Sequence, residues 1–213
     1  MVEDKQIKES VEFLRKKISP MSSLISMLDS DSILDVKDLN SEQQKIINSM
    51  IQENLLIDIG RGIVTDSDWS PNDFLLRQLV LKQGIYSGNT ALYLWELSDQ
   101  FPYTVDMTFK TGYKLPASLS KWTNNVNVRQ VSKSKVDLFV TELAVSGTNK
   151  KIKIYTPERC LIESIQSSAA ILDVNTAIKN YLSMPSGNAN KLLMVAKRLG
   201  NYKKIRQILE ILL

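Results

Sequence analysis

The sequence predicts an α+β protein, in which a mainly helical N-terminal part precedes a part that mixes short strands with helices. Up to residue 54, apolar residues recur at helical spacing. In residues 55–64, apolar and polar residues alternate around two glycines. After residue 104, β-branched runs precede four further helical segments. A chain of 213 residues, 43% of them hydrophobic, can form one large domain or two small ones. We expect two domains, at 1–80 and 81–213.

The composition excludes several classes of site. Cys160 is the sole cysteine and the chain has no histidine, which excludes an internal disulfide, a Cys/His zinc site and Ser-His-Asp or Cys-His catalysis. An enzyme would have to use Asp, Glu, Lys or a metal held by oxygen ligands. We expect a protein that is not an enzyme and has no catalytic residues, cofactor, metal or small-molecule substrate. The charged N-terminus and the absence of a long apolar run predict a soluble, cytoplasmic chain that does not enter the membrane.

The first helices are expected to be amphipathic and short. Apolar residues at helical spacing predict a helix over 4–18, which the Ser-Pro pair at 19–20 should end. A second helix is expected over 21–29. The stretch "SILDVKDL" then supplies a short extended piece and a helical turn.

The helix expected over 41–54 is the best formed of this part. Ser41 can act as its N-cap, and Asn54 can adopt the left-handed conformation that ends a helix. One face is apolar and carries Ile46, Ile47, Met50 and Ile51. The other side carries hydroxyl, amide and lysine side chains, at Ser41, Gln44, Lys45, Asn48, Ser49 and Gln52.

The next stretch, "LLIDIGRGIV" at 55–64, allows two structures. A Gly-Arg-Gly loop can cradle a phosphate, or it can form the tight tip of a β-hairpin. A phosphate-binding loop should open a helix whose N-terminus faces the anion, whereas Ile63 and Val64 continue as a strand. The hairpin is therefore favoured, and short helices followed by a longer helix and a hairpin are the order of a winged helix-turn-helix.

In that arrangement the polar side of 41–54 would be the recognition face, because Asn and Gln side chains pair with adenine edges in the major groove. Arg61 would lie at the tip of the wing, within reach of a phosphate or the minor groove. The predicted DNA-binding residues are Ser41, Gln44, Lys45, Asn48, Ser49, Gln52 and Arg61. The alternative is a solvated helix face that binds nothing.

The second domain is predicted to hold a small sheet and several C-terminal helices. Helices are expected over 72–83 and from a cap at Ser87 to about Leu97. Strands are expected over 105–109, 126–131, 136–145 and 150–155. Thr156 and Pro157 begin a further helix, and three more are expected over 173–183, 188–199 and 201–212.

Some residues of this domain have two interpretations. Glu158 and Arg159 are interpreted as a pair at the start of a helix rather than as a catalytic acid with its partner. Cys160, in an apolar run, is expected to be a buried thiol. Four aromatic residues are expected to pack in the core rather than to stack on bases, namely Tyr86, Tyr93, Trp95 and Phe101.

Charge is distributed unevenly between the two domains. Residues 1–80 hold 9 Lys and Arg against 14 Asp and Glu, a net charge of −5, whereas residues 81–213 hold 18 against 9, a net charge of +9. A basic C-terminal domain suggests an anionic partner, and scattered solubilising lysines are the alternative. The candidate phosphate-contacting residues are Lys110, Lys114, Lys133, Lys135, Lys150, Lys151, Lys197, Arg198, Lys203, Lys204 and Arg206.

Three segments resemble the AbiEi family, the antitoxins of bacterial abortive-infection systems of type IV. "LLIDIGRGIV" after a helix is similar to the end of the family's winged helix, and "GIYSGNTALYLWELSDQFP" is similar to its central block. "IYTPERCLIESI" is similar to the start of its Tyr-x-Pro-Glu-Arg helix. The segments occur in the family's order and spacing. The sequence departs from the family at Gly88, where a histidine is frequent, and in a less basic recognition helix.

The resemblance implies a toxin–antitoxin system that gives phage resistance. An N-terminal winged helix would bind inverted repeats in the promoter of its own operon and act as a transcriptional repressor. The C-terminal α+β domain would supply the antitoxic activity. The functional partner would be a nucleotidyltransferase-like toxin encoded next to it, with no stable complex required.

Two further hypotheses remain at this point. In the first, the C-terminal domain of the antitoxin acts as an enzyme on the toxin or its target. In the second, this domain neutralises the toxin by direct binding, which an exposed apolar patch would favour. In both cases the winged helix would be structural.

Overall fold

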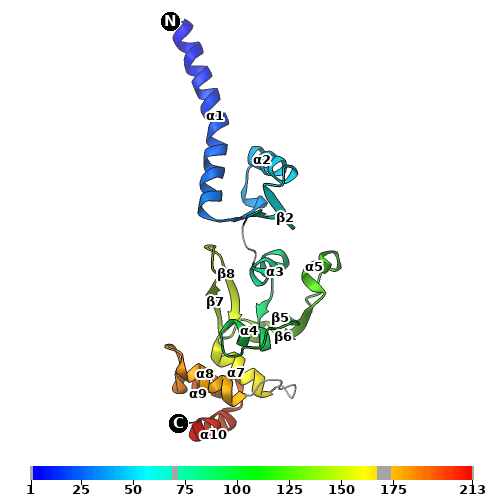
Figure 1. Cartoon of the computed structure of the whole chain (residues 1–213), viewed down its shortest axis with the longest axis vertical. Coiled ribbons are helices and arrows are strands. Elements are labelled where there is room, and N and C mark those ends of the chain that lie inside the picture. Colours follow the sequence, from blue (N-terminus) through cyan, green and yellow to red (C-terminus); the bar gives the residue numbers. More distant parts are fainter. Residues whose placement is uncertain (1, 69–71, 167–173, 213) are drawn as a thin grey trace. The chain divides into compact units, whose positions relative to one another are not determined.

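The computed structural model describes residues 2–68, 72–166 and 174–212. The chain divides into two compact units. The first unit comprises Met1–Val80 and Ala144–Lys150, and the second comprises Leu81–Leu143 and Lys151–Leu213. The described residues form a mixed α+β structure with one sheet of three strands and one of five (Figure 1).

Along the sequence of the first unit, helical elements lie before, between and after the strands of a small sheet. Its helical elements are α1 (Val2–Ser30), the 3₁₀ turn η1 (Val36–Asp38), α2 (Ser41–Gln52) and α3 (Asp73–Leu81). Its strands are β1 (Ile33–Asp35), β2 (Leu56–Gly60) and β3 (Ile63–Asp66), in the antiparallel order β1-β3-β2. The core is apolar and formed by Leu24, Leu34, Leu39, Ile47, Leu56 and Val64.

The expected break at the Ser-Pro pair was wrong, because α1 runs through Pro20 as one helix. A proline inside a helix removes one hydrogen bond and costs about 3 kcal/mol. Contacts that are remote in sequence hold this turn together: the amide of Gln43 donates to the carbonyl of Pro20 at 3.2 Å and to the hydroxyl of Ser23 at 2.7 Å. Leu24, one turn further on, is buried in the core.

The start of α2 also differs from the expectation, since Asn40 rather than Ser41 is the N-cap. The side chain of Asn40 accepts from the backbone N–H groups of Glu42 and Gln43, and the side chain of Gln43 accepts from Asn40 in return. This reciprocal capping box satisfies more backbone donors than Ser41 would one residue later. Asn54 has a φ of 59°, which confirms the left-handed residue expected after the helix.

The hairpin expected at 55–64 is confirmed. β2 pairs with β3 in antiparallel register, with an irregularity between Asp58 and Gly60. Gly60 and Gly62 have φ values of 113° and 81°, which glycine accommodates without strain, and Arg61 between them has a left-handed φ of 56°. β3 begins at Ile63, so the glycines form the turn of a hairpin and do not open a helix.

The second unit is built on a mixed sheet. Its strands are β4 (Ile85–Tyr86), β5 (Val105–Lys110), β6 (Val126–Val131), β7 (Val140–Ala144) and β8 (Lys151–Tyr155), in the order β6-β5-β4-β8-β7. β4 pairs antiparallel with β5 and parallel with β8, and β5 pairs parallel with β6. The helical elements are α4 (Gly88–Leu94), η2 (Ala117–Leu119), α5 (Ser120–Thr123), α6 (Lys133–Val136), α7 (Pro157–Gln166), α8 (Val174–Ser183), α9 (Ala189–Leu199) and α10 (Tyr202–Leu212).

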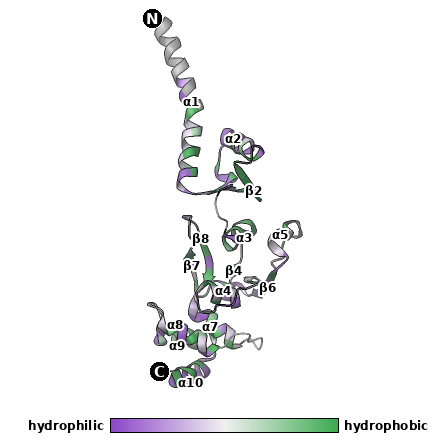
Figure 2. Cartoon of the chain, viewed as in Figure 1, coloured by the Kyte–Doolittle hydropathy of each residue, from purple (hydrophilic) through white to green (hydrophobic). Residues whose placement is uncertain are grey.

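Two elements of this unit are shorter than expected. α4 ends at Leu94 instead of about Leu97. The strand expected over 136–145 begins only at Val140, because α6 precedes it and buries Val136. The remaining strands and the closing helices lie within a residue or so of their expected bounds. Among the described residues, none of the helices combines the length and apolar character that crossing a bilayer would require, and Figure 2 shows hydrophilic and hydrophobic residues interspersed along the later turns of α1.

Candidate functional site

The outward side of α2 is the first candidate site. Ile47 is fully buried, and Ile46, Met50 and Ile51 pack against the same core, so the opposite side of the helix faces solvent. Five of the six polar residues expected there are exposed, namely Ser41, Lys45, Asn48, Ser49 and Gln52. They present hydroxyl, amide and ammonium groups on one helix.

Gln44 is the sixth of these residues, and its side chain is committed within the fold. Its amide nitrogen donates to the carbonyl of Leu39 at 2.9 Å and to that of Val36 at 3.2 Å. Gln44 is only partly exposed and holds η1 against the first turns of α2. Ser49 is exposed, and its hydroxyl donates to the carbonyl of Lys45 in its own helix.

Arg61 is exposed at the turn of the β2–β3 hairpin. Its Nη1 donates to the backbone carbonyl of Val80, near the end of α3, at 3.2 Å. This bond connects the hairpin turn to α3 within the first unit. A guanidinium has five N–H donors, so one such bond leaves others to meet a ligand.

The candidate phosphate-contacting lysines before residue 155 lie in different surroundings. Four of them are exposed in the second unit, at Lys110, Lys114, Lys133 and Lys135. Lys150 lies in the turn that belongs to the first unit and forms an ion pair of 3.2 Å with Asp31. Lys151 lies 3.8 Å from Glu142 on the neighbouring strand β7, and both side chains are exposed.

The connection between α9 and α10 brings three of the candidates together. Lys197, Lys203 and Lys204 line one hollow of about 580 Å³, and it is completed by Ala196, Gly200, Asn201 and Tyr202. The side-chain nitrogen of Asn201 is buried and has no hydrogen-bond partner among the described residues. Arg198 is exposed on α9, and Arg206 forms an ion pair of 2.8 Å with Glu210, whose hydrogen bond raises the pKa of that arginine.

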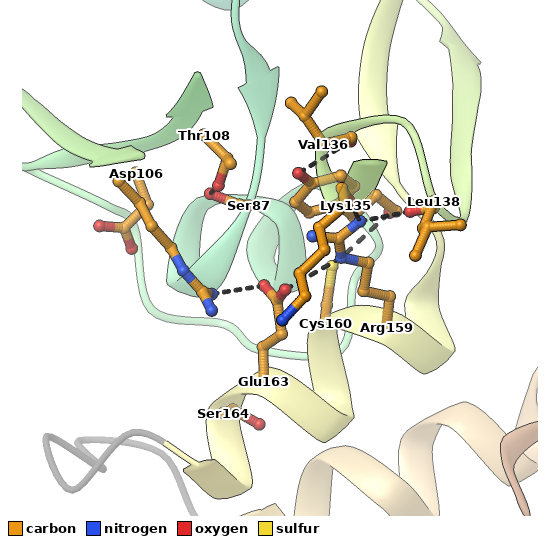
Figure 3. Close-up of polar contacts among 12 residues, drawn as sticks. Ser87, Asp106, Thr108, Lys135, Val136, Leu138, Arg159, Cys160, Glu163 and Ser164 are labelled. Carbon is orange, nitrogen blue, oxygen red and sulfur yellow. Dashed lines mark hydrogen bonds and ion pairs between the residues drawn. The ribbon is translucent and has the colours of Figure 1, made fainter. Parts of the chain in front are cut away.

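A second group of polar side chains surrounds α7 and is largely buried (Figure 3). Glu163 accepts from Nε of Arg159 at 2.9 Å and from Nη1 of Arg129 at 2.7 Å. Nη1 of Arg159 donates to the carbonyls of Lys135 and Leu138. The Arg159 guanidinium also lies over the ring of Tyr155, 3.4 Å from its centroid.

The cluster around Glu163 was not anticipated, because its members come from three separate segments. The spacing of Arg159 and Glu163, four residues apart on a helix, was the available signal. Arg129 lies on β6, 34 residues from Glu163, and no local pattern connects them. Burial raises the pKa of Tyr155 to about 12, and the nearby Arg159 opposes that shift.

Glu158 belongs to a different set of contacts at the start of α7. Its Oε1 accepts from the hydroxyl of Tyr181 and from Nζ of Lys191, both at 2.8 Å. Burial alone would raise the pKa of this carboxyl, but the hydrogen bonds from Lys191, Tyr181 and the backbone outweigh it and hold the pKa below its ordinary value. Glu158 is therefore a structural anion that connects α7 to α8 and α9.

The cysteine and the aromatic residues of the second unit lie partly in its core and partly at its surface. Cys160 is a fully buried thiol, as expected, and burial raises its pKa. Tyr86 is buried, whereas Phe101 is exposed and contacts Tyr93 edge to face. The core interpretation was wrong for Phe101. Within the part of the chain that the structure describes, no group of three or more His, Cys, Asp or Glu is placed to hold a metal ion.

Comparison with known proteins adds information on the fold. No family model matches the chain, and no curated protein matches it. The crystal structure of the RV2827C protein from Mycobacterium tuberculosis is similar in structure, with a TM-score of 0.53 and 13% sequence identity. The similarity covers 84% of this chain and 71% of that chain. At this identity the similarity concerns the fold alone.

Proposed function

We propose that the first unit is a winged helix-turn-helix that binds DNA, with α2 as the recognition helix and the β2–β3 hairpin as the wing. The observation that carries this proposal is the exposed row of Lys45, Asn48 and Gln52 on α2, followed directly by a hairpin with Arg61 at its turn. Amide side chains can pair with base edges, and the two cations can contact phosphates.

The resemblance to AbiEi antitoxins extends this proposal to a biological role. The protein binds inverted repeats in the promoter of its own operon and represses transcription. It also counteracts a nucleotidyltransferase-like toxin encoded next to it, without requiring a stable complex. The mixed α+β structure of the second unit is compatible with an antitoxin domain of this family.

Basic side chains of the second unit assist DNA binding in this proposal. Residues 1–80 carry a net charge of −5, which repels DNA, whereas residues 81–213 carry +9. Lys197, Lys203 and Lys204 share one hollow, so they can neutralise neighbouring phosphates together. Neutralised phosphates release counterions, and binding must then weaken steeply as salt increases.

The test is binding of the full chain to its own upstream DNA across a salt series, compared with a scrambled duplex of equal length. We expect a clear preference for the upstream DNA and a steep salt slope for both duplexes. The absence of any preference would refute sequence-specific binding. The double variant Lys45→Ala/Asn48→Ala should lose about tenfold or more in affinity for the upstream DNA, because each base contact contributes about 1–3 kcal/mol.

A matched control variant separates the recognition face from charge and surface effects. Lys179→Ala/Asn190→Ala removes the same two residue types from exposed positions on α8 and α9. This variant should keep its preference for the upstream DNA. If both double variants lose the preference equally, the outward side of α2 is not the recognition face.

Growth rescue tests the antitoxin role separately. Co-expression of the full chain with the adjacent toxin should restore growth, and Lys45→Ala/Asn48→Ala should restore it too, because the activity is assigned to the second unit. Loss of rescue by this variant would instead connect antitoxicity to α2. An enzymatic antitoxin is not favoured, because Glu163 is bonded to Arg129 and Arg159, and Oε1 of Glu158 is bonded to Lys191 and Tyr181.

A further inference from the structure

One side of α1 carries large apolar side chains that the first unit does not cover. Ile18, Met21 and Ile25 are 60%, 51% and 58% exposed, although Leu24 beside them is buried at 3%. Figure 1 shows α1 continuing well beyond α2 and β2, the elements of its own unit. α1 therefore carries an exposed apolar stripe beside the face that packs against the core of the first unit.

The sequence continues this stripe toward the N-terminus with the spacing of a coiled coil. Apolar residues alternate at intervals of four and three along α1, at Ile7, Val11, Leu14, Ile18, Met21 and Ile25. Six such positions correspond to three heptads, the length from which a heptad pattern indicates a coiled coil. Pro20 falls at position c of this register, outside the seam.

The residue types at the two seam positions favour a particular partner. Position a carries Val11, Ile18 and Ile25, all β-branched, and position d carries Ile7, Leu14 and Met21. β-branched residues at a with Leu at d favour a parallel coiled coil of two helices; Leu14 follows this pattern at d, unbranched Met21 is close to it, and Ile7 at the N-terminal end departs from it. Such a seam matches an identical helix, because each a residue meets the same residue of the other copy.

The flanking positions are compatible with that parallel arrangement. In a parallel pair, position g of one helix lies next to position e of the following heptad on the other. These pairs are Glu3 with Lys8, Ser10 with Arg15 and Lys17 with Ser22. One is an opposite-charge pair and none joins like charges, so the register has no electrostatic penalty.

We propose that α1 is a dimerisation helix, which pairs in parallel with α1 of a second copy of this chain through Ile7, Val11, Leu14, Ile18, Met21 and Ile25. Pairing removes the exposed apolar stripe from water and adds packing to a helix that contains a proline. The inference goes beyond DNA binding, and its test uses the full chain without DNA, so either proposal can fail while the other stands.

The test is the mass of the full chain by sedimentation equilibrium over a concentration series. We expect twice the mass of the single 24.1 kDa chain. In Ile18→Lys/Ile25→Lys the mass should fall by half while the circular dichroism spectrum is unchanged, because both side chains are exposed in the single copy. A wild-type chain that remains at single mass at every concentration would overturn the proposal, as would a dimer that persists in this variant.

The matched control is Ser19→Lys/Ser26→Lys, which adds the same charges to exposed positions b of the same helix. This variant should keep the doubled mass. If it also halves the mass, charge on α1 rather than the seam controls association, and the proposed seam is wrong.

Cross-linking tests the parallel register. Cys160 is fully buried, so a thiol introduced by Met21→Cys is the reactive one. A short bismaleimide should join two Met21→Cys chains, since position d lies opposite itself in a parallel pair, and should not join two Ser19→Cys chains. A dimer that yields no cross-link at Met21→Cys would overturn the parallel arrangement. If the chain associates with a different protein and not with itself, the choice of a second copy as the partner is wrong.

Discussion

Three charged residues of α7 and two polar residues of α2 have opposite environments. On α7, Glu158, Arg159 and Glu163 are buried and bonded to other side chains or to carbonyls. On α2, Lys45 and Asn48 are exposed. A charge that leaves water must find partners in the protein, whereas an exposed one keeps its hydration and remains available to a ligand. The contacts of the first set account for a stabilising role, and the exposure of the second set is what the proposed recognition role requires.

Arg159→Ala should give the largest loss of stability. It removes the partner of a carboxylate that is buried beside it, as well as the contact with the Tyr155 ring. Breaking a buried ion pair from one side costs about 3–5 kcal/mol. Urea unfolding of the full chain measures this loss.

The pair Arg206–Glu210 on α10 provides a matched control for that prediction. It has the same residue types, the same spacing and nearly the same distance, 2.8 Å against 2.9 Å, but its side chains are 61% and 58% exposed instead of 3% and 7%. Arg206→Ala should not change the urea midpoint measurably. If both variants lose similar stability, burial is not what distinguishes the two pairs.

Glu158→Gln should change how stability depends on pH. The pKa of this carboxyl lies below its ordinary value of 4.5, so the folded state binds its proton less readily than the unfolded state. Its contribution is complete above pH 4.5 and is lost as the pH falls through the lower folded pKa. The variant should be less stable than wild type at neutral pH, and the difference should shrink on acidification. Thermal unfolding across this pH range checks the sign, and a difference that grows in acid would contradict it.

Gln44→Ala should have a smaller effect, and it divides α2 itself into two sets of polar residues. Gln44 donates to two carbonyls near η1, and loss of such bonds costs about 1 kcal/mol. Urea unfolding measures the change. The neighbouring variant Lys45→Ala, at an exposed position, is expected to stay within about 0.5 kcal/mol of wild type. Equal losses of stability in the two variants would contradict this division, because the hydrogen bonds of Gln44 would then contribute no more than an exposed lysine.

The fold was predictable from the sequence wherever a local pattern decides the structure. The apolar face around Ile47, the turn at Gly60 and Gly62, and the strand from Val126 to Val131 are where the sequence indicated. Each depends on residues close together in the chain, through helical spacing, positive φ angles or alternation. The exposed candidates Lys45 and Asn48 were identified for the same reason, because the two sides of a helix follow from its period.

Other features depended on contacts between distant segments. α1 continues through Pro20, where the side chain of Gln43, 23 residues away, packs the helix onto its unit by donating to the Pro20 carbonyl. The side chain of Gln44 is committed within the fold because two carbonyls before α2, those of Val36 and Leu39, lie within reach of its amide. Arg129 meets Glu163 only because β6 and α7 are brought together in the second unit. Local sequence pattern therefore determined the type and order of most elements, while tertiary structure decided which polar groups were buried, since desolvation and pairing depend on neighbours in space.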